Sequence, residues 1–164
     1  MLLLDRTGEI DDLWPMAGDE LPSSGRAFVP FSRLGEAMTC ELELGVEIPN
    51  TLDLSELQPH LGRLAMISVD FPGFADGRGF SIGRKLRALG FLGRLRAAGP
   101  VISDQFTYLL QCGYDEVALP DHIVERQPIN DWLAQLSLVT TGYQRGIAGR
   151  GSILDQRRDC SGQQ

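Results

Sequence analysis

Two aspartates and two arginines beside glycine-rich turns are the residues of this chain best suited to chemistry. Asp70 and Asp76 can act as general acid–base groups if burial tunes the pKa of their carboxylates. Arg78 and Arg96 can clamp an anionic substrate next to them. The glycines free the backbone for close approach to a ligand, and a helix start offers unpaired amides. We therefore predict a substrate- or anion-binding site that joins these four residues to Gly77, Gly79, Ser81, Gly99, Asp104 and Gln105.

The predicted site residues follow short apolar segments that have the character of buried strands. Helices with apolar stripes are predicted over 80–89 and 102–112, and connections of that length favour parallel βαβ units. Ligands in such folds bind beyond the carboxyl ends of the strands. We predict an α/β fold with a mostly parallel sheet, either open or an incomplete βα barrel, in which strand 65–71 lies parallel to 94–98. The other strands are predicted at 27–29, 44–48, 115–119 and 138–143.

The chain is predicted to hold one folded domain of ordinary size. Residues 27–144 form this α/β domain, residues 1–26 form an N-terminal arm, and the Gly-, Arg- and Gln-rich residues 145–164 form a disordered tail. Leu2–Leu4 has the composition of an edge strand. We expect Trp14 to pack the acidic arm onto the domain, with contact to a partner protein as the alternative.

Strand alternation places Ser68 and Asp70 on one face of strand 65–71, and Arg96 stands alone between apolar residues of the next strand. Because an unpaired charge near a core is costly, we predict that Asp70 and Arg96 pair. The loop Asp76–Ser81 is predicted to share one cavity with Arg96 and the loop 99–105. The alternative is that Arg78 pairs with Asp76 and binds nothing.

Charge is distributed unevenly along the chain. The net charge is −7, residues 1–60 contain 12 acidic residues and three arginines, and residues 77–100 contain six basic residues and no acid. A basic segment in an acidic protein favours an anionic small molecule or an acidic partner and argues against nucleic acid. No apolar run is long enough for a membrane span, so a cytoplasmic location is expected.

The cysteines and histidines form no recognisable metal-binding or disulfide pattern. The three cysteines are widely spaced, and neither histidine stands at ligand spacing. No metal site is predicted, and because the chain lacks the nucleotide-binding motifs GxxxxGK[ST] and GxGxxG, the cofactor is left unknown.

Several motifs resemble a bacterial family known as domain of unknown function 934. They are DFPGFADGRGFS at 70–81, LRAAG at 95–99, Asp104-Gln105 and CGYD at 112–115. The chain departs from the family pattern at Arg94, Pro100 and Ser103, where the pattern has glutamate, aspartate and a basic or long polar residue. Acid–base roles for positions 94 and 100 are therefore absent here.

The resemblance implies a role in sulfur metabolism, because members of that family are typically encoded beside genes of assimilatory sulfite and sulfate reduction. We expect an accessory protein that binds an anion or docks on sulfite reductase or another sulfur-assimilation enzyme. Oxidoreductase activity is implied by the resemblance alone. Two alternatives remain: a stand-alone enzyme that acts on an anionic small molecule through an Asp/Arg site, and a structural interaction module that uses the acidic arm.

Overall fold

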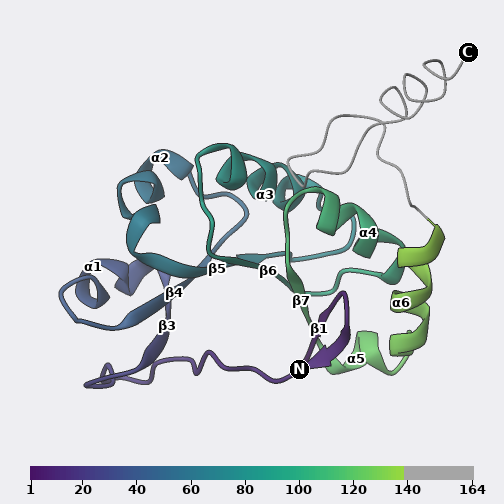
Figure 1. Ribbon diagram of the computed structural model, residues 1–164, viewed down its shortest axis with the longest axis horizontal. Helices are drawn as coiled ribbons and strands as arrows, with labels where there is room; N and C mark the ends of the chain where they lie inside the picture. Colours follow the sequence, from purple (N-terminus) through teal and green to yellow (C-terminus); the bar gives the residue numbers. More distant parts are fainter. Residues whose placement is uncertain (139–164) are drawn as a thin grey trace, which may run out of the picture.

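The computed structural model describes residues 1–138, which form a seven-stranded sheet covered by helices (Figure 1). The strands lie in the order β2-β1-β7-β6-β5-β4-β3. Their bounds are β1 Leu2–Asp5, β2 Gly8–Ile10, β3 Arg26–Pro30, β4 Glu43–Ile48, β5 Leu64–Asp70, β6 Arg94–Ala98 and β7 Glu116–Leu119.

The sheet is mixed. Strands β3 to β7 are parallel to their neighbours, and the predicted parallel pairing of β5 with β6 is confirmed. Strand β1 pairs antiparallel with β7, and β2 pairs antiparallel with β1. The α/β class is therefore confirmed, but the prediction of a mostly parallel sheet is wrong, because the N-terminal residues add a hairpin to its edge. The predicted strand at 2–4 exists, although β2 rather than β1 is the edge.

Helices α1 to α4 lie on the same face of the sheet, as Figure 1 shows. Consecutive parallel strands joined by right-handed crossovers require this one-sided arrangement, which differs from the two-sided arrangement of a doubly wound sheet. The helices are α1 Leu34–Ala37, α2 Leu54–Leu57, α3 Arg78–Ala88, α4 Ser103–Gln111, α5 Asp121–Val124 and α6 Ile129–Leu138, with 3-10 turns at Phe31–Arg33 and Gln58–Arg63. The strand predicted at 138–143 begins at the last residue of α6, and its remainder lies outside the described residues, as does the predicted tail.

The main core lies between the sheet and helices α1 to α4. Every second residue of the central strands points into it, including Val46, Ile67, Val69, Leu95 and Val117, all fully buried. The helices contribute matching apolar stripes, such as Ile82 and Leu86 of α3 and Phe106 and Leu109 of α4. The alternate residues of the strands therefore point to the opposite face of the sheet.

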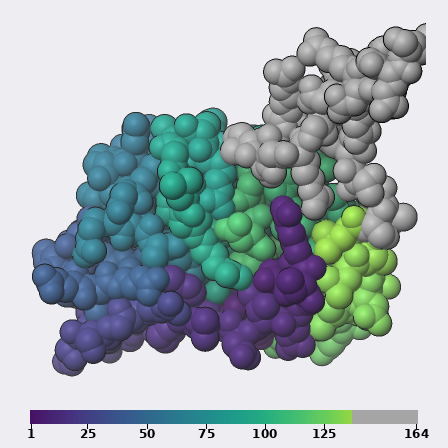
Figure 2. Space-filling view, in the orientation of Figure 1, coloured from purple at the N-terminus to yellow at the C-terminus, as the bar shows by residue number. Residues whose placement is uncertain are grey.

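Residues 11–25 connect β2 at one edge of the sheet with β3 at the other, and we call the first part of this connection, residues 11–17, the strap. Figure 2 shows the N-terminal residues packed along one side of the molecule. Trp14 is only 7% exposed and forms a small second core with Phe28 and Met66. The strap then pairs with β3, because Ala17 donates to the Phe28 carbonyl at 2.8 Å. The expectation that Trp14 packs the arm onto the domain is confirmed, and we call the sheet face opposite α1 to α4 the strap face.

No helix within residues 1–138 has the length and apolar character needed to cross a membrane.

Candidate functional site

The two loops that carry most of the predicted site residues are in contact. The Gln105 side-chain amide donates to the Phe74 carbonyl at 2.7 Å, and the Phe71 backbone N–H donates to the Ala98 carbonyl at 2.7 Å. Gly99 has φ +132°, and an added Cβ would lie 2.1 Å from the Phe71 carbonyl oxygen. Only glycine fits there. The structure thus brings together the loops that follow β5 and β6.

Asp76 and Arg78 are partners within the first of these loops. The Arg78 side chain donates to both Asp76 carboxylate oxygens, with the shortest distance 2.6 Å, and its backbone N–H donates to Oδ1 at 3.1 Å. The Arg78 guanidinium holds the pKa of the Asp76 carboxyl well below its usual range. An internal carboxylate therefore already occupies the start of α3, where we predicted an external anion. A carboxyl with a strongly lowered pKa is a poor acid–base group near neutral pH.

Gly79 has a packing role in α3. An added Cβ would lie 2.2 Å from the Phe71 ring, and the Tyr114 hydroxyl donates to the Gly79 carbonyl at 2.6 Å. Gly77, by contrast, borders open space. The remaining predicted members, Ser81 and Asp104, are exposed near the starts of α3 and α4.

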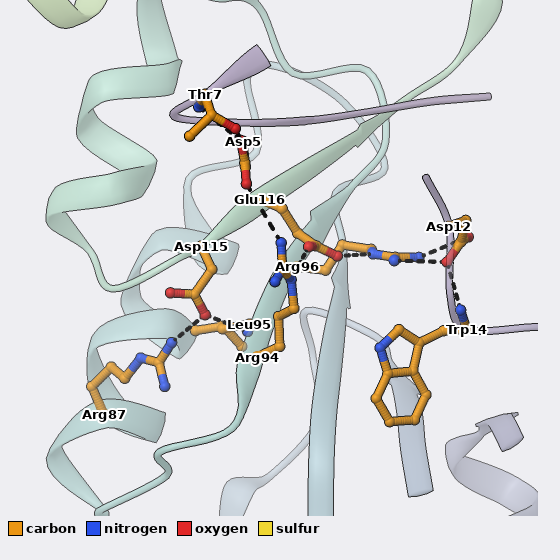
Figure 3. Close-up of polar contacts among 10 residues, drawn as sticks. All are labelled: Asp5, Thr7, Asp12, Trp14, Arg87, Arg94, Leu95, Arg96, Asp115 and Glu116. Atoms are coloured by element: carbon orange, nitrogen blue, oxygen red, sulfur yellow. Dashed lines mark hydrogen bonds and ion pairs between the residues drawn. The ribbon is translucent and has the colours of Figure 1, made fainter. Parts of the chain in front are cut away.

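Arg96 lies on the strap face, where Figure 3 shows its guanidinium between two carboxylates. Its Nε donates to Glu116 at 2.6 Å, while Nη1 and Nη2 donate to the two Asp12 oxygens at 3.2 and 3.0 Å. The register sets Arg96 beside Ser68 and Asp70 beside Ala98. The predicted Asp70–Arg96 pair is therefore wrong, because Glu116 stands directly across from Arg96 on the next strand.

A second ion pair continues this arrangement toward β1. Arg94 contacts Glu116, and its Nη2 lies 3.6 Å from an Asp5 carboxylate oxygen. Partial burial opposes ionisation of Asp12, but hydrogen bonds from Arg96 and Trp14 outweigh it and lower the pKa of that carboxyl. The carboxylates of the strap, of β1 and of β7 therefore neutralise the arginines of β6.

Sequence reasoning missed Glu116 and Asp12. The sequence contains a signal for Glu116: if β6 and β7 are neighbours, strand alternation puts Glu116 on the same sheet face as Arg96. No local signal existed for Asp12, which is 84 residues from Arg96.

Most of the basic segment 77–100 is neutralised internally. Four of its six bases form ion pairs, namely Arg78, Arg87, Arg94 and Arg96. Lys85 and Arg84 form no ion pair with any residue of 1–138. Lys85 lies close enough to Asp53 to contribute to the lowered pKa of that carboxyl, to which hydrogen bonds with Ser55 contribute most.

Arg84 belongs to an aromatic surface formed by α3, α4 and the loop before α3. Its guanidinium stacks over the Tyr108 ring at 5.1 Å, and the Phe80 ring lies 4.9 Å from the same tyrosine. Tyr108 is 43% exposed and Phe74 is 60% exposed. Gln105, one turn before Tyr108, holds the Phe74 backbone. We call Phe74, Phe80, Arg84 and Tyr108 the α3–α4 patch.

Asp70 is exposed at the carboxyl end of β5, on the strap face. Glu47 of β4 lies near it, and burial together with the Asp70 charge raises the pKa of Glu47. An open pocket of about 590 Å³ lies at the opposite, amino-terminal edge of β6, lined by Asp5, Arg6, Thr7, Leu92, Gly93, Arg94 and Asp115. That pocket contains none of the predicted site residues.

Comparison with known protein families assigns the chain to one of them. Residues 45–154 match the family described as "Bacterial protein of unknown function (DUF934)", and the chain belongs to this family. No curated protein matches the chain. The matched range includes both loops, α3 and α4, so the α3–α4 patch lies within the family region.

Proposed function

We propose that this protein is an accessory factor of assimilatory sulfur reduction, and that it docks on sulfite reductase, or on another enzyme of that reduction, through the α3–α4 patch. Membership of the family supports the proposal, together with the association with sulfite and sulfate reduction genes that the sequence resemblance implies. The proposal selects docking on a protein over binding of a free anion.

We choose docking over anion binding because the arginines of the predicted site already pair with carboxylates of the protein. A site for sulfite or sulfate needs cationic groups that are free to contact the anion. Arg78 already holds Asp76, and Arg96 holds Glu116 and Asp12. An anion would have to displace a carboxylate at either arginine, so these residues support a structural role.

The observation that carries the docking proposal is the exposure of Tyr108 beside Arg84, an arginine without an acidic partner in residues 1–138. The exposed Phe74 lies on the loop that Gln105 ties to the same helix. Exposed aromatic rings retain unfavourable contact with water, which a partner surface removes. The few residues that dominate binding energy at protein interfaces are enriched in tryptophan, tyrosine and arginine. Arg84 selects a partner with acidic groups opposite the rings.

A deletion strain tests the physiological part of the proposal. Cells that lack the gene should need cysteine, or grow slowly, when sulfate or sulfite is the sulfur source. Wild-type protein and Leu92→Ser, which alters an exposed leucine outside the patch, should restore growth, whereas the double variant Phe74→Ser/Arg84→Glu should not. Normal growth of the deletion strain on sulfate would remove the role in sulfur reduction.

One observation favours a second candidate, a stand-alone enzyme on the α/β scaffold. Asp70 lies at the carboxyl end of a parallel strand, forms no ion pair with any residue of 1–138, and is open to solvent. It is the one predicted acid–base residue that the fold leaves free, since Asp76 is held by Arg78. Purified protein that turns over an anionic substrate, with loss of activity in Asp70→Asn, would support this candidate over docking alone.

A further inference from the structure

Three oxygen-bearing side chains lie next to one another on the strap face at the carboxyl ends of β4 and β5. Glu47 is the register partner of Ser68, and Asp70 follows Ser68 by two residues on the same face of β5. The alternate residues of these strands, such as Val46, Ile67 and Val69, point into the core under the helices. In α/β sheets ligands bind beyond the carboxyl ends of the parallel strands.

The hydroxyl group of Ser68 has no hydrogen-bond partner among residues 1–138. Ser68 is 1% exposed, and its hydroxyl oxygen is buried. A buried hydroxyl that has lost water and gained no partner costs free energy. The neighbouring Arg96 does not satisfy it, because its side-chain nitrogens serve Glu116 and Asp12, as Figure 3 shows.

The carboxylates beside Ser68 also lack partners. Neither Glu47 nor Asp70 forms a hydrogen bond or an ion pair with a side chain among residues 1–138, in contrast to Glu116, Asp12 and Asp5 on the same face. Two carboxylates close together with no cation between them repel each other. A positively charged ligand would relieve both the repulsion and the unpaired hydroxyl.

The donor atoms select the kind of cation. Two carboxylates and a hydroxyl form an all-oxygen donor set, which suits Mg²⁺, Mn²⁺ and Ca²⁺ rather than zinc or copper.

We infer that Glu47, Ser68 and Asp70 form a binding site for a hard divalent cation of the Mg²⁺ type. Water molecules complete the coordination on the side of Ala98, the small register neighbour of Asp70. The site lies on the strap face, whereas the α3–α4 patch is built on the helices of the other face. The inference is therefore independent of the docking proposal.

Titration of the full-length, chelator-treated protein with Mn²⁺, followed by electron paramagnetic resonance, tests the site. Wild type should bind one Mn²⁺, which Mg²⁺ displaces, and Mg²⁺ should raise the temperature of unfolding. Glu47→Gln and Asp70→Asn preserve side-chain size and should each weaken binding at least tenfold, while Ser68→Ala should weaken it several-fold. Glu43→Gln, an exposed acid of the same strand paired with Arg26, should bind as wild type does.

Two results would overturn the inference. One is wild-type protein that binds no Mn²⁺ and is not stabilised by Mg²⁺ at millimolar concentration. The other is Mn²⁺ binding that persists unchanged in Glu47→Gln/Asp70→Asn. The wild-type titration decides the matter even if a variant fails to fold.

Discussion

Glu116 connects the charged side chains of the strap face. It is 1% exposed and contacts both Arg96, which is 4% exposed, and Arg94. Removing ionised groups from water is expensive, and the cost is recovered only while every partner is present. Glu116 stands first in an otherwise apolar strand, so its position in the fold is explained by the two arginines of β6.

Glu116→Gln is expected to destabilise the protein by about 3 kcal/mol, because it leaves two arginine side chains with too little opposite charge. Glu43→Gln removes a carboxylate from a solvent-exposed pair with Arg26 and should cost less than about 1 kcal/mol. Urea unfolding, monitored by circular dichroism, measures both free energies. Similar losses for the two variants would show that burial of the Glu116 pair is not important for stability.

Helix α3 depends on two glycines for its close approach to the body of the protein. The Phe71 ring packs against Gly79, and the Tyr114 ring packs against Gly83, where an added Cβ would lie 2.4 Å away. Glycine inside a helix weakens it, so these positions trade helix stability for contact with aromatic rings. The contact also fixes the position of the loop before α3, which carries Phe74.

Gly79→Ala is expected to destabilise the protein by about 1–3 kcal/mol, because the new methyl group overlaps the Phe71 ring. Gly77→Ala is the matched control. Its site has φ −77° and open space, so the change should be neutral or stabilising by up to about 1 kcal/mol. Thermal unfolding of the two variants compares them directly, and a stable Gly79→Ala protein would contradict the packing role.

The sequence carries enough information for the βα units but not for the partners of their charged residues. Apolar segments and helix stripes predict β3 to β7, α3 and α4, because each pattern is local. The place of β1 in the sheet could not be predicted, since its antiparallel pairing with β7 joins residues more than 100 positions apart. The sequence also placed Arg96 on the correct face, yet its carboxylates come from β7 and the strap rather than from β5.

Asp76 and Arg78 show that the partners of charged side chains are hard to predict even when the two residues are close in the sequence. The sequence places both residues in the loop that leads into a helix, and it leaves open whether Arg78 binds an external anion or Asp76. The structure shows that the aspartate reaches the helix start and the arginine at once. A side chain two residues away competes with any dissolved anion at a high effective concentration.

The strap holds the two edges of the sheet together. Asp12 binds Arg96 from the beginning of the strap, and Trp14 fills the space above Gly45, whose missing side chain leaves room for the indole. Arg26 stacks on the outer side of the same ring at 5.3 Å. The strap thus covers the small core on the sheet face opposite α1 to α4.

Trp14→Ala is expected to cost about 3–5 kcal/mol, because it empties that small core. The exposed neighbour Leu13→Ala should cost less than about 0.5 kcal/mol. Hydrogen exchange of the Ala17 and Phe28 amides, which join the strap to β3, should accelerate in Trp14→Ala alone. Unchanged exchange at both amides would show that the strap is held by other contacts.

Docking through the α3–α4 patch is the central claim, and binding to purified sulfite reductase from the same organism tests it most directly. Sedimentation velocity should show a complex with the wild-type protein that weakens as salt rises. Phe74→Ser and Arg84→Glu should each lower the affinity at least tenfold, about 1.4 kcal/mol, while Leu92→Ser should bind as wild type does. Absence of a complex at tens of micromolar protein, or equal binding by all four proteins, would contradict the claim.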